Sequence, residues 1–184
     1  MAGVTKSMPD GSWLVLEYRP AGLFSLKSSM ATSAVGKTLL VPTPYAIKMA
    51  LVDAAFRRGY DYDRCAEFLK ELVHVEVKVA PPERAVVTHT FVKVRQEPKR
   101  REPLRPYISS IAYREVVYHH GIWRWAFKAK HDAAVYEAII ECAPAVNYIG
   151  KRGSFVQFVG YHEVAGDIGP GFTQAIDGSS EWVV

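Results

Sequence analysis

The chain has 184 residues, of which 49% are hydrophobic, and a formal net charge of +4, so it is long enough for one well-buried core or two small fused modules. The first dozen residues contain no apolar stretch, and the longest apolar segment, residues 38–56, is interrupted by Pro42, Pro44, Lys48 and Asp53, which argues against a signal peptide or a membrane span. The two cysteines lie outside any Cys/His ligand spacing, so we expect neither disulfides nor a metal or cofactor, and a reducing cytoplasm is the simplest location.

The N-terminal third combines a strand, a long irregular segment and a helix. Residues 12–18 are rich in β-forming residues and lie between turn residues, which predicts a strand. Residues 23–41 show no apolar periodicity, which predicts a long loop of the kind that is usually functional or disordered. Thr43 and Pro44 then provide an N-cap and a first helical position, and apolar residues repeat at helical spacing until Arg57, Arg58 and Gly59, which predicts a helix.

The middle of the chain predicts a short helix and four strands. Asp63 is the expected cap of a helix that ends near Lys70, and residues 72–79 and 85–94 alternate as strands on either side of two prolines. Residues 107–118 and 122–129 form the next two strands, with His119, His120 and Gly121 as a hairpin turn between them.

Asp132 is predicted to cap a last helix that ends near Cys142, and residues 154–161 form the last strand. Without its insertions the order is β, α, β, β, α, β, which is the ferredoxin-like (RRM-like) α+β plan. Long inserted loops and an extra β-hairpin complete the prediction. Residues 1–161 form one domain in this interpretation, with a basic insertion at residues 95–106 and an acidic tail at residues 162–184.

The charges are distributed unevenly along this plan. Six cations and two acids lie between Lys93 and Arg105, whereas no Lys or Arg and four acids follow Gly160. A basic segment and an acidic end indicate different partners for each.

Residues 147–154 (NYIGKRGS) connect the last helix to the last strand and place two cations between two glycines. Glycine lets a ligand approach the main chain, whose N–H groups can bind an anion, and Lys151 and Arg152 add charge at the same place. A phosphate-binding loop and an ordinary turn with solvated cations explain these eight residues equally well.

Three further motifs have competing interpretations. Residues 31–38 resemble a nucleotide-binding P-loop, but they lack its first glycine, its preceding strand and its following helix, so we reject that function. His119 and His120 are candidates for acid and base catalysis together with nearby tyrosines and Lys128, although exposed turn residues are the more common case. Trp123, Trp125 and Phe127 share one face of a strand, which favours the core over a base-stacking platform and leaves Arg124 facing outward.

Two of these segments resemble one protein family. Residues 41–51 (VPTPYAIKMAL) resemble the proline-led first helix of the RAMP-superfamily CRISPR proteins, and specifically of the "Cas five" family. Residues 148–153 stand where that superfamily carries its glycine-rich loop. The resemblance covers most of residues 12–161.

The resemblance implies a non-catalytic subunit that caps the 5′ end of the guide RNA in a CRISPR interference complex. Its partners would be the guide RNA, the backbone-forming and large subunits and, through the complex, target DNA, with no role for a membrane. A metal-independent endoribonuclease that uses His119 and His120, and a stand-alone ferredoxin-like RNA-binding module, are the alternatives. The residues expected to contact RNA are Lys27, Lys37, Lys48, Lys99, Arg100, Arg101, Arg105, Arg124, Tyr148, Gly150, Lys151, Arg152 and Gly153.

Overall fold

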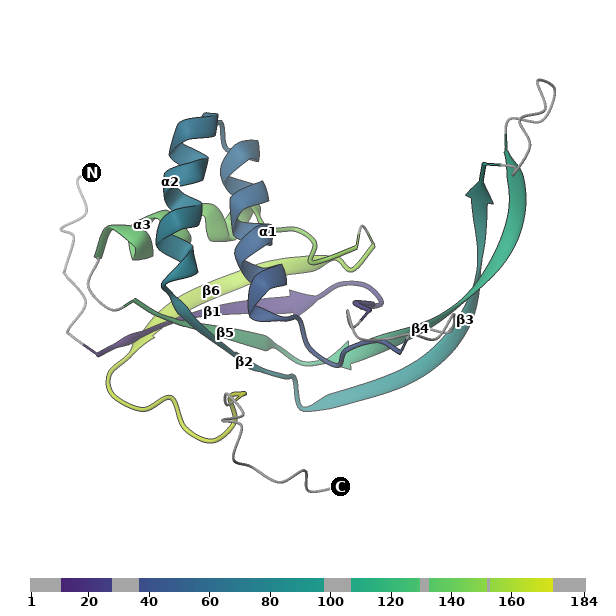
Figure 1. Ribbon diagram of the computed structural model, residues 1–184. Helices are drawn as coiled ribbons and strands as arrows, with labels where there is room; N and C mark the ends of the chain where they lie inside the picture. Colours follow the sequence, from purple (N-terminus) through teal and green to yellow (C-terminus); the bar gives the residue numbers. More distant parts are fainter. Residues whose placement is uncertain (1–10, 28–36, 98–106, 130–132, 152, 174–184) are drawn as a thin grey trace, which may run out of the picture.

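The computed structural model describes residues 11–27, 37–97, 107–129, 133–151 and 153–173 (Figure 1). Its centre is an antiparallel sheet of four strands in the order β2-β5-β1-β6, formed by β1 (Trp13–Pro20), β2 (Glu76–Ala80), β5 (Trp123–Lys128) and β6 (Val156–Val164). The helices α1 (Pro44–Arg57) and α2 (Tyr62–Val73) connect β1 to β2, and α3 (Ala133–Cys142) with the 3-10 helix η1 (Ala143–Ala145) connects β5 to β6. This arrangement confirms the predicted ferredoxin-like α+β fold.

The first helix begins as predicted. The hydroxyl of Thr43 accepts a hydrogen bond of 3.2 Å from the N–H of Ala46, and Pro44 occupies the first turn. The start of the second helix was predicted wrongly, because Asp61 and not Asp63 accepts the capping bond, at 2.8 Å from the N–H of Arg64. This helix also continues to Val73, so the strand that was predicted from residue 72 starts only at residue 76.

The three helices cover one face of the sheet (Figure 1). Trp123, Trp125 and Phe127 point to this face and are at most 1% exposed, and the ring of Tyr18 stacks on Trp125 at a centroid distance of 4.1 Å. These side chains belong to the main hydrophobic core, which confirms the core interpretation of the alternating aromatic residues.

The opposite face of the sheet is covered by the chain itself. Trp13, Val15 and Ala126 are buried there against Val164, Ile168 and Phe172, on the side away from the helices (Figure 1). The backbone N–H of Thr173 donates to the carbonyl of Val79 at the edge of β2, at 2.8 Å. The sheet face on which RRM domains stack single-stranded RNA is therefore not open at its apolar centre.

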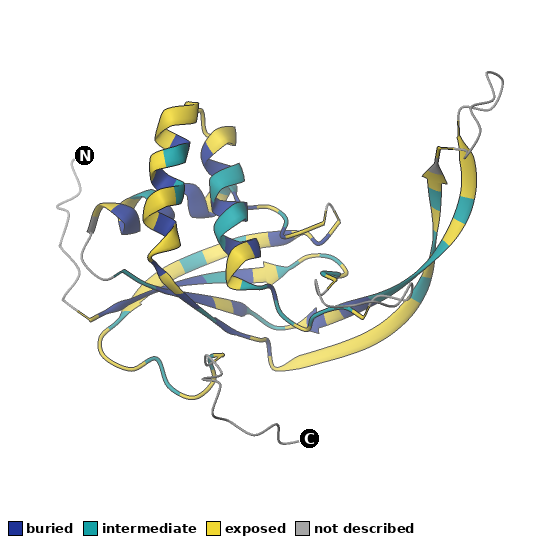
Figure 2. Ribbon diagram, viewed as in Figure 1, coloured by how far each residue is buried: buried dark blue, intermediate teal, exposed yellow. Residues whose placement is uncertain are grey.

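Strands β3 (Arg84–Gln96) and β4 (Ile108–His120) form a second sheet of two strands among the described residues. This hairpin is a curved arm that extends from the body (Figures 1 and 2). Thirteen residues per strand correspond to a length of about 40 Å. The predicted hairpin between β4 and β5 is therefore wrong, because the extra hairpin is made by β3 and β4. The chain leaves the main sheet at Pro81 and Pro82 and returns at Gly121, where a Cβ would lie 3.2 Å from the Cβ of Pro82.

Among the described residues, no helix is long and apolar enough to cross a membrane. The last strand starts at Val156 and ends at Val164, which shifts it by two to three residues from the predicted span. The expected helix cap Asp132 and the rejected P-loop residues 31–36 lie outside the described residues.

Candidate nucleic-acid interface

The predicted glycine loop is a compact turn before β6. The N–H of Ile149 donates to the carbonyl of Ser154, and the N–H of Ser154 donates to the carbonyl of Lys151, both at 3.1 Å. Gly150 and Gly153 have φ values of 70° and 110°, a region that side chains other than glycine rarely enter. The two glycines are thus needed for the turn itself, and they leave Lys151 exposed at its tip.

This glycine loop packs against the segment that follows β1. The N–H of Ser25 donates to the hydroxyl of Ser154 at 3.2 Å. A Cβ on Gly22 would lie 2.8 Å from the carbonyl oxygen of Gly153, and one on Gly150 would lie 3.0 Å from a methyl carbon of Leu26. The close approach of the two backbones places Lys151 near Lys27.

The same segment also lies along β4 at the base of the arm. Phe24 and Val117 exchange two backbone hydrogen bonds of 2.9 and 2.8 Å as an antiparallel bridge. This bridge is isolated, and the segment makes one further contact with β4 because the hydroxyl of Ser25 donates to the carbonyl of Glu115, the neighbour of Arg114, at 3.1 Å.

Lys27, Arg114 and Lys151 therefore come from three separate segments to one place, which we call the cation cluster. Partial burial lowers the pKa of Lys151, and the charges of Arg114 and Lys27 lower it further. A bound anion offsets the repulsion between like charges that lie close together in the free protein. Glu115 is the acid next to the cluster on β4, and it is engaged by His89 at 3.1 Å and by the N–H of Thr38 at 2.8 Å.

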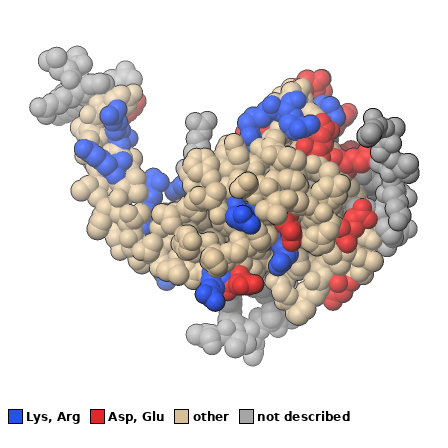
Figure 3. Space-filling model, turned by 180° about the vertical axis from the view of Figure 1, so that it is seen from behind, with Lys and Arg blue, Asp and Glu red and all other residues tan. Residues whose placement is uncertain are grey.

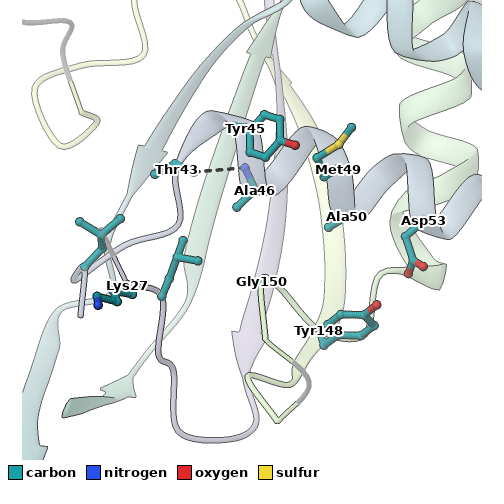
Figure 4. Close-up of a pocket in the computed structure, with 11 residues that line it drawn as sticks. Lys27, Thr43, Tyr45, Ala46, Met49, Ala50, Asp53, Tyr148 and Gly150 are labelled. Atoms are coloured by element: carbon teal, nitrogen blue, oxygen red, sulfur yellow. Dashed lines mark hydrogen bonds between the residues drawn. The ribbon is translucent and has the colours of Figure 1, made fainter. Parts of the chain in front are cut away.

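A groove of about 850 Å³ lies between α1 and the glycine loop (Figure 4). Ala46 and Ala50 lie on the α1 side of the groove, and Tyr148 and Gly150 belong to the opposite side. Lys27 belongs both to this groove and to the cation cluster. The structure thus joins a charged site and an apolar groove through one side chain.

The other candidate residues are distributed differently. Lys48 lies on α1, where its Nζ donates to the carbonyl of Val73 at 3.2 Å. Arg124 forms an ion pair of 3.1 Å with Glu17 on the sheet face opposite the helices. Lys37 is exposed. The candidates outside the described residues are Lys99, Arg100, Arg101, Arg105 and Arg152.

Lys and Arg side chains also lie along the arm (Figure 3).

Five of the predicted site residues lie together at the groove and the glycine loop. They are Lys27, Tyr148, Gly150, Lys151 and Gly153. Arg114 was missed, because its position within a predicted strand carries no signal that Lys27 lies beside it.

His119 is not the exposed turn residue that the sequence predicted. It is only 4% exposed, and its Nε2 lies 2.8 Å from the carbonyl of Leu40, so this nitrogen must donate a proton. Burial lowers the pKa of His119, and Nδ1 has no hydrogen-bond partner among the described residues. Phe24 and Trp123 pack around the ring at centroid distances of 5.8 and 4.9 Å, which favours a neutral imidazole.

The remaining members of the proposed catalytic cluster are divided. Tyr118 and His120 line a pocket of about 370 Å³ together with His119, whereas Tyr113 and Lys128 lie elsewhere, and His131 lies outside the described residues. Tyr113 stacks on His89 within the arm, with ring centroids 5.1 Å apart, and six residues of strand separate it from His119, or about 20 Å. Lys128 lies over the ring of Trp13 at 5.3 Å. His120 is exposed at the end of β4. Within the described part of the chain, no three His, Cys, Asp or Glu residues are placed to hold a metal ion.

Comparison with known proteins finds similarity in structure only, because no protein-family model and no curated protein sequence matches the chain. The chain resembles the cryo-EM structure of the Type III-B Cmr-beta bound to cognate target RNA with a TM-score of 0.56 and 11% identity, over 84% of this chain and 61% of that chain. A CRISPR protein from Archaeoglobus fulgidus matches with a TM-score of 0.48 and 15% identity, over 83% and 64% of the two chains. A CRISPR RNA-guided surveillance complex matches with a TM-score of 0.49 and 15% identity, over 76% and 58%.

The chain thus spans between 58% and 64% of the length of these solved structures. At a TM-score of 0.56 and 11% identity, the likeness to the Cmr-beta structure shows a shared fold. The fold implied by the resemblance of residues 41–51 and of the glycine loop is thus confirmed.

Proposed function

We propose that this chain is a non-catalytic RNA-binding subunit of a multisubunit CRISPR interference complex, where it caps the 5′ end of the guide RNA. The observation that carries the proposal is the cation cluster of Lys27, Arg114 and Lys151 next to an apolar groove. Phosphate contacts by Lys and Arg supply most of the affinity for nucleic acid when sequence is not read. The structural neighbour described as bound to cognate target RNA supports RNA as the ligand class.

The arm supports a role as a subunit over a stand-alone module. Phe91 and Ile111 are 72% and 75% exposed on it, and most of the arm is accessible (Figure 2). They lie on one face of the hairpin, because Phe91 pairs with Tyr113, two residues from Ile111. Large exposed apolar side chains of this kind are typical of protein interfaces. The backbone-forming and large subunits are the partners that the family resemblance suggests, and target DNA would be reached through the assembled complex.

The environment of His119 supports binding over cleavage. A general base must reach the reacting hydroxyl within hydrogen-bond distance, whereas the His119 ring is enclosed by aromatic side chains and its Nε2 is bound to Leu40. His120 and His119 line one pocket of about 370 Å³, but they are neighbours in the same strand, so their side chains point to opposite faces. The runner-up function remains a metal-independent endoribonuclease.

The test is the salt dependence of binding to a labelled single-stranded CRISPR repeat RNA. Each phosphate contact to a single strand contributes about 0.7 to the slope of log K against log salt. The Lys27→Ala/Lys151→Ala variant should therefore reduce the slope by about 1.4 and weaken binding to all RNA sequences alike. Lys70→Ala, which removes an exposed lysine from α2, is the matched control and should leave the slope unchanged.

An unchanged slope in the double variant would contradict the proposal. The same incubations, carried out without metal, also separate binding from cleavage. Intact RNA is expected throughout, and specific cutting by the wild-type chain that is lost in His119→Ala/His120→Ala would favour the endoribonuclease instead.

A further inference from the structure

We infer that the groove beside α1 holds one nucleobase of the bound RNA, while the phosphate of that nucleotide lies on the cation cluster. The inference rests on the proposed function, since it names what part of the RNA enters this groove. It also adds a preference for bases that carry an exocyclic amino group, which the cation cluster alone does not provide.

The groove has the shape and lining that a flat ring requires. Its volume of about 850 Å³ lies within the range of about 300 to 1,000 Å³ that is usual for small-ligand sites. Ala46 and Ala50 present small side chains from α1, so a planar ring can approach the helix closely. Tyr45 lies on the side of α1 and Tyr148 on the side of the glycine loop (Figure 4), and tyrosine rings are common stacking partners of unpaired bases.

The charges at the two ends of the groove match the two ends of a nucleotide. Lys27 lies at one end and belongs to the cation cluster, and Asp53 lies at the other end (Figure 4). The Oδ2 atom of Asp53 accepts a hydrogen bond of 2.9 Å from Nε of Arg57. Its second carboxylate oxygen, Oδ1, is an acceptor of the kind that binds the amino group of adenine, cytosine or guanine. Uracil has no such donor.

This charge arrangement favours a nucleotide over an apolar side chain of a partner protein. An apolar side chain would fill the groove without using Lys27, whereas a nucleotide uses the apolar walls and the adjacent cations together. The glycine loop belongs to the same wall, because the absence of a side chain at Gly150 lets the loop pack against Leu26, which also lines the groove.

The experiment compares Tyr148→Ala with Tyr148→Phe on single-stranded repeat RNA. Tyr148→Ala should weaken binding by about 5- to 150-fold, the range expected for loss of one base–aromatic stack, and Tyr148→Phe should bind nearly as wild type because the ring remains. The salt slope should stay constant in both. Tyr62→Ala, which removes a 76% exposed tyrosine from α2, is the matched control.

An abasic nucleotide placed at each RNA position in turn locates the base. One position should weaken binding as much as Tyr148→Ala does, and the two changes together should cost no more than either alone, since both remove the same contact. Replacing the base at that position by uracil should weaken binding of the wild-type chain but not of Asp53→Ala.

Failure of the groove site and failure of the proposed function give different results. If Tyr148→Ala and every abasic RNA bind as wild type while Lys27→Ala/Lys151→Ala still reduces the salt slope, the base site is wrong and the RNA-binding function stands. If the wild-type chain binds no RNA, the proposed function is wrong. In that case adenosine 5′-monophosphate tests the groove directly, and an absence of shifts in the NMR signals of Ala46, Ala50 and Tyr148 overturns the site.

Discussion

Replacement of Gly22 by alanine is expected to disturb the candidate site from a position that touches no ligand. The added Cβ would lie 2.8 Å from the carbonyl oxygen of Gly153 and 3.6 Å from the backbone nitrogen of Phe155. Both neighbours are main-chain atoms, so they cannot move aside by a side-chain rotation. The glycine loop and the segment that carries Lys27 must then separate.

The magnitude follows from the size of this overlap. Insertion of a methyl group into a packed region costs about 1 to 3 kcal/mol. For a chain of this size, 1 kcal/mol lowers the melting temperature by about 2 to 4 °C, so Gly22→Ala should melt about 2 to 12 °C below wild type. RNA affinity should fall as well, because the loop displacement moves Lys151 relative to Lys27.

Thermal unfolding and RNA binding of the same preparation provide the assay. Gly160→Ala is the matched control, since no heavy atom lies within 4 Å of the added Cβ and the residue has no positive φ. It should change stability by less than about 0.5 kcal/mol. Equal melting temperatures and equal RNA affinities of Gly22→Ala and Gly160→Ala would show that the added Cβ does not separate the glycine loop from the segment that carries Lys27.

Two further predictions concern His119 and Lys48. Burial lowers the pKa of His119 in the folded chain, so as the pH falls the unfolded chain protonates this histidine before the folded chain does. The free energy of unfolding therefore decreases as the pH falls from about 6.5 toward the folded pKa. His119→Phe should remove this component from denaturant unfolding measured between pH 7.5 and 5, and an identical pH dependence in both proteins would contradict it. Lys48→Met loses the hydrogen bond to Val73 at the end of α2, so it should lower stability by no more than about 1 kcal/mol and leave the RNA salt slope unchanged, whereas a reduced slope would place Lys48 at the RNA.

The elements predicted correctly depend on interactions between near neighbours in the sequence. Thr43 and Pro44 start α1 because a capping oxygen and a fixed φ act within one turn. The alternation of Trp123, Trp125 and Phe127 identifies a strand with one apolar face, and burial of that face follows directly from its hydrophobicity. The left-handed turns of Gly150 and Gly153 are likewise local.

Strand partners and the composition of the site depend on tertiary structure. Alternation marks β4 as a strand but carries no information on whether β3 or β5 pairs with it, and the exposed or buried state of His119 follows from that choice. The cation cluster forms only because residues 24–27 lie between β4 and the glycine loop, which brings Lys27, Arg114 and Lys151 together from positions that are tens of residues apart. Sequence alone thus determined the local geometry of the glycine loop, whereas the long-range packing of three backbones decided which charges accompany it.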